Sequence, residues 1–267
     1  MKILTTALLS LAVGSTASAT DLQLTVSPEV AKPGQIVTVT MTNTSATDTY
    51  TLPSPCLWKS VNAGGYNAVP VFNMFCGSFL SPVAPGQTIS MAWDQTDDSG
   101  SQVGDGTYVF PVRIYDASFS TITMAPTVVV SSVTNPPALY GKGGAGSAGW
   151  APILGSHGVP SVGNSAFHLS VYDALGAAPA MMLISAKAGE TTVGWGTYLL
   201  DLSAPVISIA LPLGGAGAGA GSLNIPAPLP NNPALIGQRA FTQVIVLDAG
   251  SAGNLAHTNG LEVILNS

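Results

Sequence analysis

Residues 84–94 read Ala-Pro-Gly-Gln-Thr-Ile-Ser-Met-Ala-Trp-Asp, and this stretch decides the fold class. The Pro-Gly pair has the backbone preferences of a tight turn. After it, Ile89, Met91 and Trp93 alternate with the small residues Ser and Ala. That spacing is typical of an antiparallel strand that buries one face and leaves the other in water. The stretch therefore predicts a turn followed by a half-buried strand, with Trp93 in the core.

The same period of two recurs along the chain. It covers residues 22–26, 37–41 and 108–114 in the first half and residues 167–171 in the second. The ranges 180–184, 206–211, 241–247 and 261–265 are further expected strands, some of them apolar on both faces. No amphipathic helix of ordinary length is evident, and only residues 232–237, with Asn, Pro and a final Gly, have the capping pattern of one helical turn. We therefore predict an all-β chain of two antiparallel β-sandwich domains, the first of them Ig-like.

Two stretches divide the chain. Lys2, an apolar run over residues 3–13 and the Ala-Ser-Ala of residues 17–19 have the features of a secretory signal peptide cleaved after Ala19. A stiff Asn-Pro-Pro at 135–137 followed by a Gly-rich run at 141–146 predicts a linker. The expected order is a signal peptide at 1–19, an Ig-like domain at 20–133, a linker at 134–149 and a second sandwich at 150–267.

Composition excludes several partners. Charged residues make up 7% of the chain, against roughly 25% in average soluble proteins, while 46% are hydrophobic, too many for a disordered chain. Without Lys2 the chain has 6 basic and 13 acidic residues, a net charge of −7, and the basic residues are scattered singly. Nucleic acid binding needs clustered positive charge, so no nucleic acid partner is expected. No later segment is apolar over 18 residues, so no membrane span is expected.

The two cysteines, Cys56 and Cys76, predict one disulfide in an oxidising compartment. Two free thiols or a metal site are the alternatives, and the lack of a nearby His makes the metal site a poor one. Closing a loop of this length would stabilise the fold by roughly 3 kcal/mol. The pair agrees with the signal peptide in predicting secretion or display at the cell surface.

Four carboxylates crowd one connection, namely Asp94, Asp97, Asp98 and Asp105. Several carboxylates and carbonyls are what Ca²⁺ prefers, so these are the candidate calcium ligands, although the Asp-x-Asp-x-Asp-Gly spacing is absent. The alternative is that the Asp side chains cap backbone N–H groups in turns. A glycosidase is not expected, because its two acids must face each other across a cleft.

No arrangement for nucleophilic catalysis is evident. The chain has no Gly-x-Ser-x-Gly motif, and its three histidines are His157, His168 and His257. His257 follows Asp248 and Ser251 closely, but residues so near in one loop rarely orient as a triad. The Gly-Ala run at 214–222 lacks the Gly-x-Gly-x-x-Gly spacing and a following helix, so it predicts a loop, or alternatively an edge that stacks between molecules. We therefore expect no enzyme and no cofactor.

The four tryptophans are the candidates for carbohydrate binding, because an exposed indole can stack on a sugar ring. Trp93 continues an apolar stripe and is expected in the core, and Trp58 lies two residues from Cys56. Trp150 and Trp195 lie in Gly-rich stretches and are the candidate ligand-binding residues.

The stretch 84–94, with Gly100 and the Gly-Thr-Tyr of 106–108, resembles the bacterial intracellular proteinase inhibitor family and the Ig-like domain of flagellar hook-capping proteins. The pattern shared with both families looks like this: a Pro-Gly turn, a strand that ends in Trp-Asp, a Gly turn and a Gly-x-Tyr that opens the next strand. The resemblance implies an Ig-like sandwich, and only the first family implies protease inhibition. This chain departs from that family in its signal peptide and its cysteine pair, and no inhibitory residue carries over.

The second half resembles a C-terminal module of exported proteins from planctomycete-like bacteria. The resemblance is carried by residues 139–143, 174–180, the uncharged run 225–235, and 243–248 with 259–261. Where that module often has a cysteine pair, this chain has Ala145 and Val159. The resemblance implies export and a β architecture, and it implies no activity.

Together these observations predict an exported, non-enzymatic binding or structural protein of the bacterial cell surface or extracellular matrix. Its partner would be a protein or a polysaccharide outside the cell. An extracellular proteinase inhibitor, which would use the loop closed by Cys56 and Cys76, is one alternative. A carbohydrate-binding module is the other.

Overall fold

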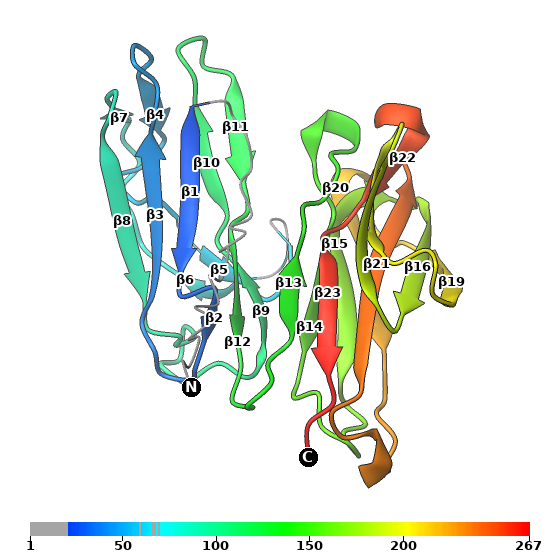
Figure 1. The fold of residues 1–267 in the computed structure, drawn as a ribbon. Coiled ribbons are helices and arrows are strands. Elements are labelled where there is room, and N and C mark those ends of the chain that lie inside the picture. Colours follow the sequence, from blue (N-terminus) through cyan, green and yellow to red (C-terminus); the bar gives the residue numbers. More distant parts are fainter. Residues whose placement is uncertain (1–20, 59, 66–67, 69) are drawn as a thin grey trace, which may run out of the picture.

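The computed structural model describes residues 21–58, 60–65, 68 and 70–267 (Figure 1). The predicted signal peptide, residues 1–19, lies outside the described residues. The described part is built from strands, with no α-helix among its residues and three short 3-10 turns. The fold class predicted from the sequence, an all-β chain of antiparallel sandwiches, is confirmed.

The described residues of the first half form twelve strands, and several of them, β1, β3, β8 and β10 among them, follow stretches of alternating apolar residues. They are β1 (Leu22–Ser27), β2 (Val30–Ala31), β3 (Val37–Asn43), β4 (Tyr50–Leu52), β5 (Ser60–Asn62), β6 (Pro70–Asn73), β7 (Ser81–Val83), β8 (Thr88–Trp93), β9 (Gly106–Val109), β10 (Val112–Tyr115), β11 (Thr121–Met124) and β12 (Thr127–Val130).

The second half holds the remaining strands and the 3-10 turns. The strands are β13 (Ala138–Tyr140), β14 (Ile153–His157), β15 (His168–Gly176), β16 (Pro179–Ser185), β17 (Ala188–Val193), β18 (Gly196–Leu200), β19 (Val206–Pro212), β20 (Gly217–Pro226), β21 (Arg239–Leu247), β22 (Leu255–His257) and β23 (Gly260–Ile264). The turns are η1 (Ser147–Gly149), η2 (Pro233–Leu235) and η3 (Ala252–Asn254). In η2 the Asn232 side chain accepts a hydrogen bond from the Ala234 N–H, which confirms the predicted helical turn.

The first sandwich packs a sheet of order β1-β3-β8 against a sheet of order β11-β10-β4-β7. Alternating residues of β3 are buried, because that central strand pairs on both edges and covers the core with one face. Trp58, Trp93 and Phe110 meet in the centre, with ring centroids 5.3 Å apart for Trp58–Phe110 and 5.7 Å apart for Trp93–Phe110. The core position predicted for Trp93 is therefore confirmed.

The second sandwich packs the strands β14-β15-β20 against a sheet of order β13-β23-β21-β16-β19. A separate hairpin, β17-β18, covers part of the outer face of the latter sheet, through Leu183, Leu200 and Ile245. The chain reaches both layers with short connections. The two edge strands β19 and β20 are consecutive in sequence, so both end the sandwich on the same side.

The two halves are joined by more than their covalent connection. One sheet runs β2-β12-β9-β14-β15-β20 and so continues from the first sandwich into the second. The crossing is made where Gly106 of β9 pairs with His157 of β14. A Cβ atom on Gly106 would lie 2.6 Å from Nδ1 of His157, so the approach of the two strands requires glycine here. Gly158 adds a backbone hydrogen bond of 2.9 Å to the Asp105 carbonyl.

Three details differ from the sequence prediction. The range predicted as a linker, 134–149, contains β13, which pairs with β23 in the second sandwich, and η1. The single strand predicted over 108–114 is two strands in different sheets, because Pro111 has no N–H with which to continue the ladder.

The third difference is the Gly-Ala run at 214–222, which was predicted as a loop. Most of it belongs to β20, which pairs with β15 through two register shifts. Gly217 and Gly219 have φ of +89° and +74°, a conformation that glycine adopts without strain. The glycines therefore allow β20 to adopt backbone conformations, in this irregular part of the ladder, that would be strained for residues with side chains.

Candidate binding groove between the two halves

A cavity of about 330 Å³ lies between the halves. Its walls come from residues 24–26, 29–30, 123–127 and 129 of the first half and from residues 138–139, 141–143, 149–153, 173 and 259 of the second. Most of these side chains are apolar. A cavity with apolar walls and a few polar groups is the usual form of a ligand site.

The first wall forms because β1 and β2 are edge elements. β1 pairs with β3 along one edge only, and β2 pairs only with β12, in parallel. Leu24 is buried, whereas Val30 on β2 is 37% exposed toward the cavity side of the molecule. Apolar side chains at the edge of a sheet stay partly exposed unless another element packs on them. Here the residues of the second half that line the cavity lie across from them.

The second wall depends on glycine at a close approach. A Cβ atom on Gly143 would lie 2.9 Å from the His257 carbonyl oxygen and 3.0 Å from that of Pro152. Asn259 in the same wall is hydrogen-bonded to β14. Its Oδ1 accepts from the Leu154 N–H at 3.0 Å, and its Nδ2 donates to the Leu154 carbonyl at 3.0 Å. These contacts fix the backbone of the wall.

Trp150 follows η1 and lines the cavity from the second half. Its indole lies against the backbone of Gly219, where a Cβ atom would come within 2.6 Å of Cε2. The indole is half-buried rather than freely exposed. Of the two tryptophans predicted as ligand-binding residues, Trp150 therefore lies in a cavity wall, on the edge of the Gly-Ala strand.

Trp195 lies elsewhere, at the β17-β18 turn. Its ring meets Tyr198 at 4.9 Å and His257 at 5.9 Å between centroids, both edge to face. Gly253 of η3 also packs on it, since a Cβ atom there would lie 2.7 Å from Cβ of Trp195. The structure does not bring Trp195 and Trp150 together in one site, and Trp195 serves to hold η3 and the hairpin.

Charged groups are few around the cavity. Glu29 of the first half and Lys142 of the second are exposed, and Asp173 is buried with φ of +55°. Gly65 of the first half packs against the Asp173 carboxylate so closely that a Cβ atom at position 65 would clash with it. These groups come from distant parts of the chain, so sequence reasoning missed them. No local motif could have identified them.

The four calcium candidates bond to separate backbone groups instead of gathering, Asp94 and Asp97 within their own turns and Asp98 and Asp105 across to other segments. Oδ1 of Asp97 accepts from the N–H groups of Ser99 and Ser101 at 2.8 and 2.9 Å. Hydrogen bonding from the Ser99 hydroxyl lowers the pKa of Asp97. Asp98 accepts from the backbone of Asn73, Asp105 accepts from Ser132, and Asp94 bonds Thr96; these contacts are those of capping carboxylates. Within the described residues, no group of three or more His, Cys, Asp or Glu side chains is placed to hold a metal ion.

The Asp248, Ser251 and His257 set has structural partners. Asp248 accepts hydrogen bonds from the Ser147 hydroxyl, from the Ser147 N–H at 2.8 Å and from the Gly250 N–H at 2.9 Å. Burial alone would raise its pKa, but these hydrogen bonds outweigh burial and hold the pKa below the usual value. Ser251 donates to the carbonyls of Ala145 and Leu255. Asp248 therefore anchors the start of η1.

His257 is buried at the centre of that region. Its Nε2 accepts from the Thr197 N–H at 3.2 Å, and burial lowers its pKa. His157 and His168 stack at 5.2 Å between ring centroids, and His157 also bonds the Tyr172 hydroxyl at 3.1 Å. The three histidines thus lie at two packing junctions, with neutral imidazoles favoured at His157 and His257.

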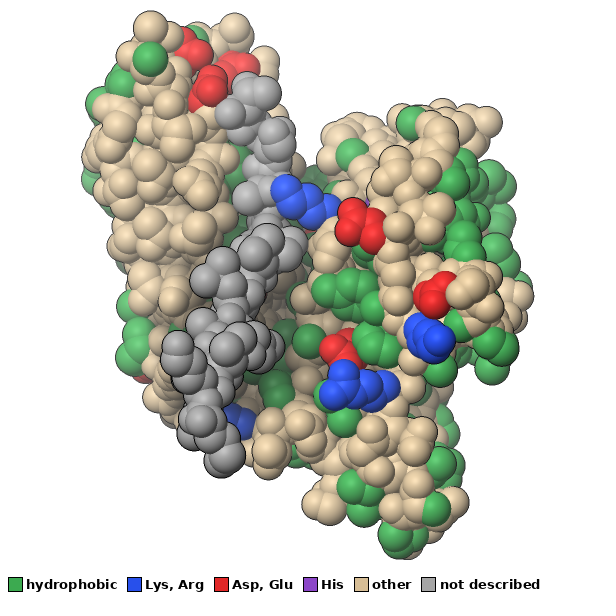
Figure 2. Space-filling view, viewed as in Figure 1, with side chains coloured by type: hydrophobic (Ala, Val, Ile, Leu, Met, Phe, Trp, Pro, Cys, Tyr) green, Lys and Arg blue, Asp and Glu red, His purple; other side chains and the backbone are tan. Residues whose placement is uncertain are grey.

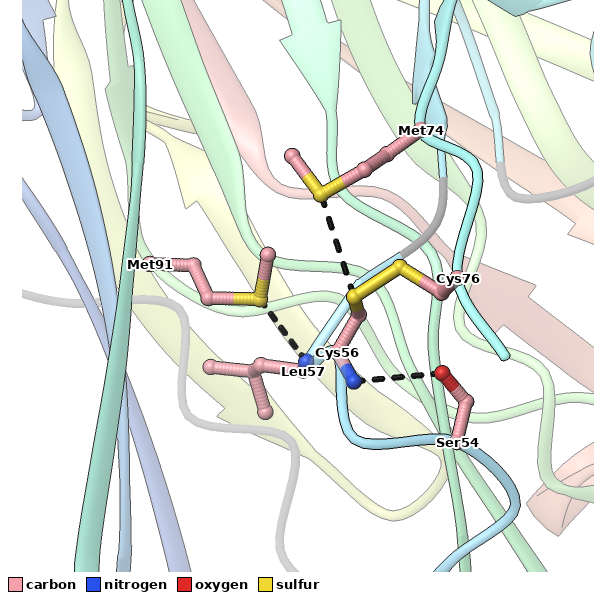
Figure 3. Close-up of a disulfide and its surroundings, with 6 residues drawn as sticks. All are labelled: Ser54, Cys56, Leu57, Met74, Cys76 and Met91. Carbon is pink, nitrogen blue, oxygen red and sulfur yellow. Dashed lines mark hydrogen bonds between the residues drawn. A yellow bond between two sulfur atoms is a disulfide. The ribbon is translucent and has the colours of Figure 1, made fainter. Parts of the chain in front are cut away.

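The predicted disulfide is confirmed. Cys56 and Cys76 are joined, with their Cα atoms 6.2 Å apart (Figure 3). Figure 3 shows two methionine sulfurs beside it: Sδ of Met74 lies 3.8 Å from Sγ of Cys56, and Sδ of Met91 accepts from the Leu57 N–H at 2.9 Å. The bridge ties the connection after β6 to the connection before β5.

No protein-family model and no curated protein matches this chain. Solved structures similar to it include a tetra-tandem repeat from the extending region of a large adhesion protein (11% identity, TM-score 0.27, 92% of this chain and 49% of that chain). A second is red sea bream transglutaminase (13% identity, TM-score 0.29, 94% of this chain and 32% of that chain). A third is a membrane-anchored protein from Corynebacterium diphtheriae (13% identity, TM-score 0.28, 90% of this chain and 59% of that chain).

The chain thus spans less than two thirds of each of these structures, and TM-scores this low carry no argument about function. The resemblances noted from the sequence, to the inhibitor and hook-capping families and to the planctomycete-type module, stay predictions. No helix among the described residues is long and apolar enough to cross a membrane.

Proposed function

We propose that this chain is an exported, non-enzymatic protein of the cell surface or extracellular matrix that binds an apolar segment of a protein partner in the groove between its halves. The observation that carries the proposal is the cavity of about 330 Å³ with mostly apolar walls from both sandwiches. An apolar segment placed there would lose its contact with water, which is the main favourable term in such binding.

Two further observations support the proposal. The disulfide fits an oxidising compartment outside the cytoplasm. The Ser, His and Asp side chains considered for catalysis have backbone partners or stack on other rings, which favours a structural role for them. The cavity walls offer few hydroxyl-binding groups, so a protein segment fits them better than a polysaccharide does.

The test uses anilinonaphthalene sulfonate, a dye whose fluorescence rises in apolar sites, titrated with the folded chain. A Val30→Asp variant places a carboxylate in the cavity wall, whereas Ile36→Asp changes a 53% exposed side chain of the same half that does not line the cavity. Val30→Asp should weaken dye binding by about tenfold, because a carboxylate resists burial. Ile36→Asp should bind the dye as the unchanged chain does.

Competition then identifies the class of partner. Apolar peptides should displace the dye, and soluble oligosaccharides should not. Equal dye binding by both Asp variants would refute the groove as the site. Displacement by oligosaccharides alone would replace the proposal with the carbohydrate-binding alternative.

A second candidate, extracellular proteinase inhibition, is favoured by one feature of the disulfide region. Phe75, next to Cys76, is 100% exposed, and Phe79 and Leu80 beyond it are also exposed. The segment 74–80 runs without hydrogen-bonded strand pairing and is fixed by the bridge. An apolar side chain presented on an anchored segment is a form that a protease cleft can accept.

Titration against a panel of serine, cysteine and metalloproteases tests this candidate. An inhibitor should act stoichiometrically, and Phe75→Asp should abolish inhibition. Phe119→Asp, an exposed change in the β10–β11 turn and outside the loop that the disulfide closes, should not. Full protease activity at a molar excess of the intact chain would exclude the candidate.

A further inference from the structure

The strand β19 leaves one side of the second sandwich open. Among the described residues it ends the sheet β13-β23-β21-β16-β19 and pairs on one edge only, with β16, in an unbroken antiparallel register from Val206 to Pro212. Figure 1 shows β19 on the side of the second half that faces away from the first. An edge strand presents a row of unpaired N–H and C=O groups that can accept another strand.

Proteins usually protect such an edge with charge, and this edge has none. Residues 202–238 contain no Asp, Glu, Lys or Arg. Ile207 is 63% exposed and Ile209 is 41% exposed, and Met181 on the neighbouring β16 is 43% exposed. Hydrophobic side chains gather along this flank of the second half in Figure 2. The edge is therefore apolar and uncharged in a chain whose net charge is −6.

The hydrogen-bond pattern shows which residues of β19 face outward. The Leu213 N–H, one residue past the strand, donates to the Ala178 carbonyl at 3.1 Å, toward the β16 side. The direction of the N–H and C=O groups alternates along an antiparallel strand. Ile207, Ile209 and Leu211 therefore bond to β16. The outward groups belong to Val206, Ser208, Ala210 and Pro212, of which Pro212 has a carbonyl but no N–H to offer.

The opposite side of β16 agrees with this assignment. Val244 of β21 directs its carbonyl to the Thr258 N–H at 2.9 Å and its N–H to the Thr258 hydroxyl at 3.0 Å, away from β16. Its partner on β16, Met182, therefore bonds in the other direction, to β19. Met182 pairs with Ile209, so the Ile209 backbone groups point inward.

We propose that β19 pairs with β19 of a second copy of this chain, antiparallel and about a twofold axis through Ile209. In this register Ser208 of each copy exchanges both backbone hydrogen bonds with Ala210 of the other. The Val206 N–H donates to the Pro212 carbonyl of the other copy, so all six outward N–H groups of the two strands are satisfied. Ile209 meets Ile209 of the second copy as a non-hydrogen-bonded pair, with Cα atoms about 4.5 Å apart. The six-stranded sheet of each copy continues into the other.

A second copy fits this edge because the edge is complementary to itself. Each outward N–H donor finds an acceptor by the same twofold rotation, and apolar Ile209 lies on the axis. The 37 residues without charge bring no like-charge pairs to the contact, although the whole chain is acidic. Pro205 before the strand and Pro212 at its end limit the pairing to one short window, which favours a closed dimer over a growing fibre.

The edge of β20, at the other layer, is less open. Gly214 pairs with Ser222 across the β19-β20 turn, and Trp150 covers Gly219. The Gly-Ala run is therefore not the contact. This inference is independent of the groove, which lies on the other side of the second half.

Association is measured by sedimentation velocity of the purified, exported chain. Because one short edge buries less than the ~1,200 Å² of stable interfaces, dimers should appear with a dissociation constant on the order of 10–100 µM. Ala210→Pro removes an outward N–H that the monomer does not use, and Ile209→Lys places two charges opposite each other. Each should raise the dissociation constant by about tenfold or more. Phe119→Lys, an equally drastic change on an exposed Phe of the first half, should leave it unchanged.

Register is tested by cysteine cross-linking, which does not depend on those variants folding. The chain has two cysteines, both in the Cys56–Cys76 bridge. Ile209→Cys should form a dimer under mild oxidation, since Cα atoms about 4.5 Å apart suit a disulfide. Ile207→Cys should not, because position 207 would lie about 13 Å from its own copy along the strand. A monomer at 1 mM, or equal cross-linking at both positions, would overturn the proposal.

Discussion

Lowering the pH from 7.5 to 4 should destabilise the junction between the two halves through His157. Its imidazole lies where Gly106 of β9 pairs with β14, bonds the Tyr172 hydroxyl at 3.1 Å and stacks on His168. Burial in this junction, with a smaller contribution from His168, lowers the pKa of His157 from 6.5 to about 4. Between these values the unfolded chain binds a proton that the folded chain does not.

The sign and size follow from that difference. Because the unfolded state holds more protons, the free energy of unfolding falls as the pH drops through 6.5, and the loss is nearly complete at the folded pKa. At 1.36 kcal/mol per pKa unit, the loss attributable to His157 is roughly 1 kcal/mol at pH 5.5 and about 3 kcal/mol at pH 4. Above pH 7 the group contributes no pH dependence.

The assay is urea unfolding followed by tryptophan fluorescence at pH 7.5, 5.5 and 4. Carboxylates and His257 also titrate in this range, so the unchanged chain is compared with His157→Gln, which cannot take up the proton. The chain should lose about 3 kcal/mol more than the variant at pH 4. His168→Gln should keep most of the effect, because burial is its main cause. Parallel pH profiles for the chain and His157→Gln would refute the reasoning.

Three further outcomes are expected. Reducing the disulfide, whose cysteines are 20 residues apart, should lower the free energy of unfolding by about 3 kcal/mol in denaturant titrations, and no change would mean that the unfolded chain is restricted by other contacts. Gly219→Ala should cost about 1–2 kcal/mol more than Gly217→Ala in thermal unfolding: both sites have positive φ, but only at 219 does the new methyl meet the Trp150 ring. Asp248→Ala should cost about 2 kcal/mol, because it removes the acceptor of the Ser147 N–H and hydroxyl. Ser147→Ala, which keeps the N–H bond, should cost less.

Local patterns predicted much of the fold. The alternation at 89–93 appears as β8, the apolar run at 206–211 appears as β19, and the Asn-Pro start with the Gly at 237 appears as η2. These features depend on near neighbours, since side-chain alternation and capping act over a few residues. The predicted bridge between Cys56 and Cys76 also formed, because two cysteines in one oxidised chain have a single way to pair.

The candidate site was beyond such patterns. Trp150 was predicted as a ligand-binding residue because it is a tryptophan in a Gly-rich stretch. The cavity that it lines is also formed by Val30 and residues 123–127, which belong to the other half of the chain. The carboxylates at 94–105 looked like ligands because they are close in sequence. In the structure each bonds to a different backbone N–H: Asp94 and Asp97 to groups within their own turns, and Asp98 and Asp105 to Asn73 and Ser132 in distant segments.

The sequence by itself determined that this chain is a weakly charged all-β protein with one disulfide, because composition and periodicity limit which surfaces can be buried. Only the tertiary structure decided that one sheet runs through both halves, that the Gly-Ala run is a strand packed on Trp150, and that β19 is the open edge. Strand order depends on pairings between residues far apart in the chain. Such pairings are chosen by the packing of whole faces, which no local stretch of sequence encodes.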